Sequence, residues 1–228
     1  MKILNKKNFW LNFLIVLLTL SISFFLGIIF NDYIWGTLTL TFGFLNAYYM
    51  AKGDWQNYIY GILFTISYAY VCTINNLYGW LIFSILFYLP VQIYGIVSWL
   101  RNKKDETVAI RSFTLKNSII ICTSIIIGSA LLGLLLSFIP SQNLAFLDST
   151  SQIINICGVI LVSLRFTECW YVWLANNIID LTIWIINVIK GTANAEMTLI
   201  TSIMYLVMNV IGLIWWIKTQ RDQKLNNK

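Results

Sequence analysis

Three polar side chains, Asn176, Asn177 and Asp180, interrupt an apolar, tryptophan-rich run at residues 168–184, ECWYVWLANNIIDLTIW. On a helix, which turns 100° per residue, five side chains of this run share one face within an arc of about 80°. They are Trp170, Trp173, Asn177, Asp180 and Trp184. An ionisable group at the centre of a bilayer costs about 2.5–3.5 kcal/mol, so we expect Asp180 to face a cavity or a partner.

No basic residue lies inside any apolar run of the chain, so Asp180 has no expected ion-pair partner. It is therefore either protonated or available to a cation that arrives from outside. Asparagine amides can also hold membrane helices together, at about 0.6 kcal/mol each. That structural role accounts for Asn176, whereas Asn177 and Asp180 fit a ligand site better.

A second set of polar and aromatic residues is expected at the same depth. Gln92 and Asn209 each lie midway along an apolar run, and Tyr88 and Tyr205 precede them by one helical turn. Amides hydrogen-bond carboxamides and ribose hydroxyls, and Trp and Tyr faces attract flat cationic rings by about 0.5–2 kcal/mol. The combined set predicts a site for a small, aromatic, cationic ligand with sugar or hydroxyl groups. A purely structural packing network is the alternative.

These side chains require helices that cross a membrane to position them. Of the 228 residues, 59% are apolar and 11% are charged, and the mean hydropathy is +0.76. Runs of about 20 apolar residues are long enough to span a bilayer core as helices. We therefore predict an all-α, polytopic membrane protein with eight segments: about 9–30, 33–50, 55–74, 79–100, 116–139, 150–166, 169–189 and 196–217.

Basic residues are distributed unevenly over the loops between these segments. All but one of the 15 Lys and Arg residues, the exception being Lys190, fall on the same side as the N-terminus. Short basic loops stay in the cytoplasm, so both termini are predicted to be cytoplasmic. The net charge of +6 thus reflects membrane topology and gives no reason to expect nucleic-acid binding.

An internal repeat relates the two halves of the chain. YLPVQIYGIVSWLR at 88–101 aligns without gaps with YLVMNVIGLIWWIK at 205–218, an offset of 117. One helix earlier, Trp55 and Tyr58 align with Trp170 and Trp173 at an offset of 115. Segments two to four thus repeat as segments six to eight, in parallel orientation, with segment five as the linker. Parallel repeats are one way in which transporters hold substrate between two halves.

The repeat divides the chain into four expected units. An N-terminal tail and additional helix occupy 1–32, and the first three-helix bundle occupies 33–102. A cytoplasmic loop and linker helix follow at 103–148, and the second bundle with a cytoplasmic tail occupies 149–228.

Metal and catalytic chemistry are not expected. The chain has no histidine, and its four cysteines (Cys72, Cys122, Cys157 and Cys169) lie singly within apolar runs, as small core residues do. The sequence shows neither paired carboxylates nor a metal-ligand cluster, so we expect no enzyme and no cofactor.

Three segments resemble the PnuC-type vitamin transporter family. Residues 77–102 (LYGWLIFSILFYLPVQIYGIVSWLRN) are similar to its Y-G…Y-L-P-x-Q-x-x-G-x-x-x-W segment. Residues 165–184 are similar to its R-x-x-E-x-W-x-x-W-x-x-x-N/D segment, and 205–218 to its closing N-x-x-G-x-x-x-W-x-K/R. The resemblance implies a SWEET-like fold, commonly trimeric, in the bacterial inner membrane, with one extra N-terminal helix. It also implies ligand contacts from Gln92, Trp173, Asn177 and Asn209, while Asp180 stands where many members are expected to carry a small hydroxyl residue.

The resemblance further implies import of nicotinamide riboside by facilitated diffusion with alternating access, and a cytoplasmic kinase that traps the cargo. Thiamine, riboflavin and deoxynucleosides are the alternative cargoes. Asp180 would balance a pyridinium or thiazolium charge, or would couple transport to protons. A different class of function is a membrane binding subunit that depends on an ATPase. AYYMA at 47–51 offers an A-x-x-x-A docking pattern for such a partner.

Overall fold

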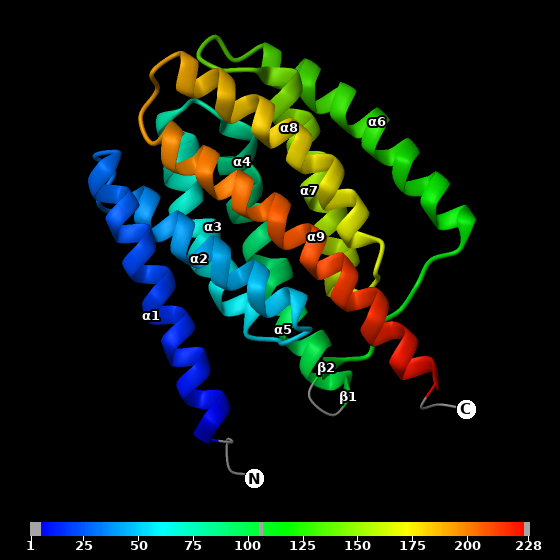
Figure 1. Cartoon of the computed structure of the whole chain (residues 1–228). Helices are drawn as coiled ribbons and strands as arrows, with labels where there is room; N and C mark the ends of the chain where they lie inside the picture. The colour runs from blue at the N-terminus through cyan, green and yellow to red at the C-terminus, as the bar shows by residue number, and fades with distance from the viewer. Residues whose placement is uncertain (1–5, 105–106, 226–228) are drawn as a thin grey trace.

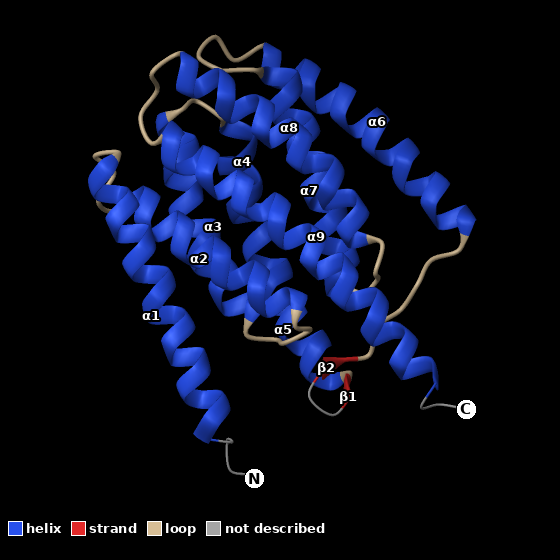
Figure 2. Ribbon diagram, viewed as in Figure 1, coloured by secondary structure: helices blue, strands red, loops and turns tan. Residues whose placement is uncertain are grey.

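The computed structural model describes residues 6–104 and 107–225, which fold almost entirely into helices (Figures 1 and 2). The elements in chain order are α1 (Lys6–Ile29), α2 (Trp35–Ala51), α3 (Asn57–Ile74), α4 (Tyr78–Phe83), the π-helical turn η1 (Ser84–Tyr88), α5 (Leu89–Arg101), β1 (Lys103–Lys104), β2 (Thr107–Val108), α6 (Leu115–Ser137), α7 (Ala145–Ser163), α8 (Cys169–Ile189) and α9 (Ala195–Leu225). The predicted all-α, polytopic fold is confirmed.

Most of these helices are long and apolar enough to cross a membrane. Among the described residues, seven helical stretches meet that description, with Tyr78–Arg101 taken as one stretch. The predicted segment at 33–50 forms α2, whose 17 residues make it slightly shorter than the others. The first turn of α1, the last turn of α9 and the β1–β2 hairpin lie at the same end of the molecule (Figure 1). We call this end the inner end and the opposite end the outer end.

Six helical stretches form a ring. Helix α2 packs against α3 and α9, α8 packs against α7 and α9, and α5 packs against both α3 and α7. Two further helices lie outside the ring. Helix α1 packs mainly on α2 and helix α6 mainly on α7, so they flank the ring on opposite sides (Figure 1). The two halves of the predicted repeat, α2–α5 and α7–α9, therefore meet along two seams, α5 with α7 and α9 with α2.

The segment predicted at 79–100 is interrupted. Helix α4 widens into the π-helical turn η1 before α5 begins, and Pro90 stands in the first turn of α5. Proline lacks the amide hydrogen that a continuous helix would use and crowds the preceding turn, so it is tolerated where a new helix starts. The corresponding stretch of the second half runs without interruption through α9.

Two helices differ from their predicted bounds by more than one helical turn. Helix α7 begins at Ala145, ahead of the boundary expected at 149, because Asp148, Ser149 and Ser151 are buried within the protein and need not avoid lipid. Helix α9 continues to Leu225, two turns beyond the predicted 217. There Gln223 accepts a hydrogen bond from the Ile110 amide and donates one to the Val108 carbonyl, which holds the end of α9 against the β2 loop.

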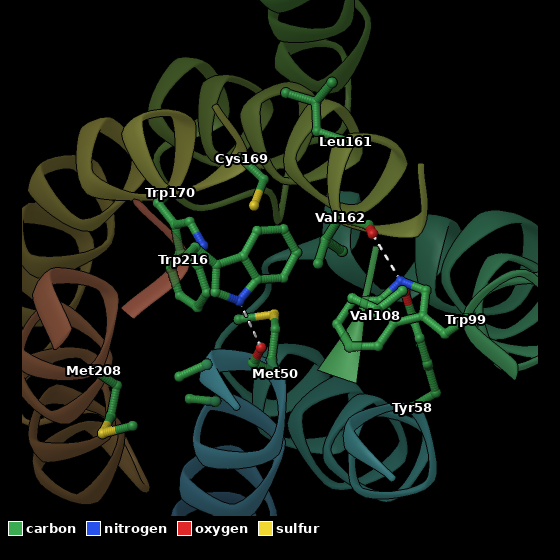
Figure 3. Packing of buried hydrophobic residues seen from close by; sticks show 12 residues of the cluster. Met50, Tyr58, Trp99, Val108, Leu161, Val162, Cys169, Trp170, Met208 and Trp216 are labelled. Atoms are coloured by element: carbon green, nitrogen blue, oxygen red, sulfur yellow. Dashed lines mark hydrogen bonds between the residues drawn. The ribbon is translucent and has the colours of Figure 1, made fainter. Parts of the chain in front are cut away.

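Four aromatic side chains form a buried layer near the inner end, which we call the inner aromatic layer: Tyr58, Trp99, Trp170 and Trp216 (Figure 3). Tyr58 meets Trp99 edge to face at 5.1 Å, and Trp170 meets Trp216 edge to face at 5.7 Å. These rings sit in spaces left by glycines, because a Cβ on Gly95 would overlap the Tyr58 ring and one on Gly212 would overlap Trp170.

This packing corrects the register of the repeat. Gly95 and Gly212 are matched by the offset of 117, and each faces an aromatic ring, which favours a correspondence of Tyr58 with Trp170. The predicted alignment matched Trp55 with Trp170 instead, three residues away. Three residues are close to one helical turn, so both alignments place aromatic residues on the same face, and only the tertiary contacts distinguish them.

Candidate functional site

A cavity of about 110 Å³ lies inside the ring, which is room for several water molecules. Every helix of the ring contributes to its walls. Seven of the nine predicted site residues line it: Tyr88, Gln92, Trp173, Asn177, Asp180, Tyr205 and Asn209. The structure thus brings together polar and aromatic side chains that are up to 121 positions apart in the printed sequence (from Tyr88 to Asn209).

Asp180 is anchored by two hydrogen bonds. The Ser151 hydroxyl on α7 donates to Asp180 Oδ1 at 2.6 Å, and Asn176 Nδ2 donates to Asp180 Oδ2 at 2.6 Å. The cavity-lining residues of the described chain include no Lys or Arg. We expected Asn176 to have only a structural role between helices. This expectation is wrong in part, because Asn176 lines the cavity and donates a hydrogen bond to Asp180.

Two of the predicted amides are paired across neighbouring helices. Asn209 Nδ2 on α9 donates to Asn177 Oδ1 on α8 at 2.6 Å. This bond uses the Asn177 carbonyl and the Asn209 amino group. Within the described part of the chain, the Asn177 amino group and the Asn209 carbonyl have no protein hydrogen-bond partner, so both can serve a ligand. Gln92 lies where a Cβ on Gly61 would come within 2.5 Å of its Oε1, so the missing side chain of Gly61 makes room for this amide.

Aromatic rings form the remaining walls. Trp80 stacks on Tyr88 with ring centroids 4.7 Å apart, and Phe64 stacks on Tyr68 at 5.2 Å. Tyr68 also meets Trp80 edge to face at 4.6 Å. Faces and edges of this kind accommodate a flat heterocycle, and the electron-rich faces attract a cation.

Two predicted site residues, Trp170 and Trp184, lie outside the lining. Trp170 belongs to the inner aromatic layer, where it packs on Gly212. Trp184 is fully buried and its indole Nε1 donates to the Tyr68 hydroxyl at 3.0 Å, so it reaches the cavity only through Tyr68. Both share the helix face of Asp180, but neighbouring helices cover this face on either side of the cavity. Helix α9 covers it at Trp170, and helix α3 covers it at Trp184. Residue spacing shows which side chains share one face of a helix, but it does not show which part of that face the neighbouring helices cover.

Sequence reasoning missed several polar lining residues, among them Asn46, Thr65, Asn155, Thr198, Thr201 and Ser202. The hydroxyls of Thr198, Thr201 and Ser202 each donate to the backbone carbonyl four residues earlier. A hydroxyl satisfied in this way costs little inside a membrane helix, so it does not stand out as Asp180 does. The 3-4-4 spacing of Thr198, Thr201, Tyr205 and Asn209 was the available signal.

A ring of membrane-spanning helices around a cavity of convergent polar and aromatic side chains defines a polytopic membrane transporter for a small molecule. The model of a family described as nicotinamide mononucleotide transporter matches residues 33–218. The chain belongs to this family, and helix α1 lies entirely before the matched region.

Named relatives agree with this membership. A protein named nicotinamide riboside transporter PnuC from Neisseria mucosa is 28% identical over 206 residues, which cover 85% of this chain and 78% of the relative. A protein of the same name from Haemophilus influenzae is 28% identical over 146 residues, which cover 62% of this chain and 64% of the relative. A solved structure described as the crystal structure of the vitamin B3 transporter PnuC matches with a TM-score of 0.77 at 25% identity, covering 91% of this chain and 90% of the other.

Proposed function

We propose that this transporter carries nicotinamide riboside into the cell by facilitated diffusion. The observation that carries the proposal is the cavity inside the ring, where one carboxylate, Asp180, lies among amides and aromatic rings without a basic residue in the described lining. Nicotinamide riboside combines a flat pyridinium cation, a carboxamide and ribose hydroxyls. Each of these groups has a matching type of side chain in the cavity.

The chemistry assigns a role to each group of side chains. The pyridinium ring suits the aromatic walls formed by Trp80, Tyr88 and Trp173, with the Asp180 carboxylate as its counter-charge. The carboxamide and hydroxyls suit the free hydrogen-bonding groups of Asn177 and Asn209. The names of the relatives, which refer to nicotinamide riboside and vitamin B3, support the same cargo.

Alternating access would use the two seams between the halves. Since cavity residues come from both halves, a rocking motion about the seams would expose the site first to one side of the membrane and then to the other. The proposed setting is a bacterial inner membrane with both termini in the cytoplasm and three copies assembled as a homotrimer. A cytoplasmic kinase acting on the released cargo would keep uptake directed inward.

Charge favours some alternative cargoes over others. Thiamine also carries a flat cationic ring, whereas riboflavin and deoxynucleosides are uncharged at neutral pH. A lone carboxylate in the cavity favours nicotinamide riboside and thiamine over the neutral compounds. Among cationic cargoes, the names of the relatives favour nicotinamide riboside.

The test is uptake of labelled nicotinamide riboside by liposomes that contain the purified protein and no ATP. We expect saturable uptake that thiamine inhibits more strongly than riboflavin does. Uptake that appears only when an ATPase partner is added would favour the binding-subunit function instead. Uptake that follows an imposed pH gradient would assign Asp180 to proton coupling, and absence of uptake under every condition would contradict the proposed cargo.

A further inference from the structure

The two donors that hold Asp180 come from different helices and are themselves deeply buried. Ser151 on α7 is 1% exposed and Asn176 on α8 is 3% exposed. Each contacts a different carboxylate oxygen, at 2.6 Å in both cases. The position of the acid is thus fixed by protein contacts on both oxygens.

A third residue contacts the Ser151 hydroxyl. Asn155 lies one turn further along α7, and its Nδ2 donates to the Ser151 carbonyl at 3.1 Å and to Ser151 Oγ at 3.4 Å. An amide N–H can only donate, so Ser151 Oγ accepts from Asn155 through one of its two lone pairs. The hydroxyl hydrogen is donated to Asp180 Oδ1, so this serine links Asn155 to the acid.

Asn176 is oriented toward the acid at the expense of its own hydrogen bonding. Its Nδ2 donates to Asp180, while its Oδ1 is buried and has no hydrogen-bond partner among the described residues. Turning the amide over would bring Oδ1 against a carboxylate oxygen, where two acceptors would repel each other. The observed orientation thus suits an ionised Asp180, because hydrogen bonds donated to a carboxylate favour its charged form.

The groups that surround Asp180 do not neutralise its charge. Tyr68 of α3, Tyr88 of η1 and Tyr205 of α9 are neutral phenols near the acid. Asp148 of α7 is a second acid, and its carboxylate accepts hydrogen bonds from the Gly79 amide and from Gln142. Since no described residue that lines the cavity is basic, we expect a positive charge beside Asp180 to come from the cargo.

We propose that Ser151 and Asn176 are positioning residues that hold Asp180 as a fixed negative charge, so that the transporter selects cationic cargo over neutral cargo of the same shape. Neither residue was among the predicted site residues. This inference rests on the proposed function for its cargo, but the charge selectivity can be measured separately. Asp180 contacts the cargo, and the two donors act through Asp180.

The experiment compares nicotinamide riboside with its dihydro form, which has nearly the same shape but no positive charge. Uptake into liposomes gives kcat/KM for each cargo with the parent protein and with Ser151→Ala and Asn176→Ala. We expect each variant to lose about tenfold for the cation, as when one hydrogen bond to a charged group is removed, and to keep the rate for the neutral form. Ser151→Thr, which restores a hydroxyl, should recover most of the selectivity.

Ser149→Ala is the matched control. Ser149 lies on the same helix, is equally buried, and donates to the Ser129 and Phe146 carbonyls on the side away from the cavity. The control should lose similar stability in a thermal melt while keeping the preference for the cation. Equal losses for both cargoes in Ser151→Ala and Asn176→Ala would mean a structural role only and would overturn the inference.

A second measurement separates this inference from the proposed function. If the parent protein carries no nicotinamide riboside, the proposed cargo is wrong. Charge selectivity is then read from tryptophan fluorescence of the purified protein titrated with 1-methylnicotinamide, a cation, and with neutral nicotinamide. A tighter binding of the cation that Ser151→Ala reduces would support the positioning role. An identical ratio in parent and variant would refute it.

Discussion

Trp99 and Trp216 make the same hydrogen bond in opposite directions across the molecule. The Trp99 indole on α5 donates to the Val162 carbonyl on α7 at 2.9 Å, and the Trp216 indole on α9 donates to the Met50 carbonyl on α2 at 3.0 Å (Figure 3). Both carbonyls lie in the last turn of their helices. Each half of the chain thus donates an indole hydrogen bond to the other half at the inner end, as a parallel duplication predicts.

Trp99→Phe and Trp216→Phe should destabilise the protein by similar amounts. Each change removes one buried hydrogen bond and part of a buried ring, so we expect a loss of about 1–3 kcal/mol in the free energy of unfolding. Thermal melts in detergent measure this. Trp215→Phe, at a position 40% exposed on the same helix, is the control and should change little. A large effect at only one of the two buried tryptophans would argue against equivalent seams.

Gly95→Ala and Gly212→Ala should also be destabilising, because the added methyl group overlaps the Tyr58 ring in one case and the Trp170 ring in the other. Overpacking of this kind costs about 1–3 kcal/mol. Gly128→Ala is a milder control, since its new Cβ would meet only the flexible Ile153 side chain, at 3.2 Å. If all three variants melt at the temperature of the parent protein, the proposed correspondence of Tyr58 with Trp170 loses its support.

Asn177 and Asn209 should act as a unit. Because Asn209 donates to Asn177 at 2.6 Å, Asn177→Ala, Asn209→Ala and the double variant should give non-additive losses of binding, with a coupling on the order of 1 kcal/mol. Titration with nicotinamide riboside measures the three affinities. Asn209→Ala combined with Ser149→Ala should be additive, and additivity in the asparagine pair as well would show that each residue acts alone.

Trp184→Phe should weaken binding although Trp184 does not line the cavity. Its indole donates a hydrogen bond to the hydroxyl of Tyr68, and Tyr68 lines the cavity. Removing this bond frees the Tyr68 side chain to rotate. We expect KM to rise by a factor on the order of ten or less, the equivalent of one hydrogen bond, with kcat nearly unchanged. Tyr68→Phe should have a comparable effect, and the double variant should be no worse than the more affected single one. A fall in kcat alone would point to a role in the conformational step.

The orientation in the membrane can be tested at two loops. With the native cysteines replaced, Lys190→Cys in the α8–α9 loop should react in whole cells with a maleimide that cannot cross membranes. Lys52→Cys in the α2–α3 loop should react only after permeabilisation, because the basic loops are predicted to be cytoplasmic. The reverse pattern would place both termini outside.

The fold was largely predictable because lipid imposes a simple rule. Apolar runs near 20 residues must be helices, as every backbone polar group has to be satisfied within its own segment. The break just before α5 has a visible cause in the sequence, because Pro90 cannot continue a helix. The start of α7 was harder, since Asp148 and Ser151 look unsuited to lipid until the neighbouring helices that bury them are known.

The sequence by itself determined the membrane class and the high cost of placing Asp180 in a bilayer, and it predicted a duplicated organisation. Hydropathy, spacing and charge are properties of the chain alone. Only the tertiary structure decided which side chains reach the cavity. Trp170 and Trp184 share the helix face of Asp180 but are covered by neighbouring helices. In contrast, Ser151 contacts the acid from another helix, and Asn155 of that helix lines the cavity. The free-energy cost of placing a side chain in the bilayer depends on its residue type. Its access to the cavity depends on how several helices pack around that cavity.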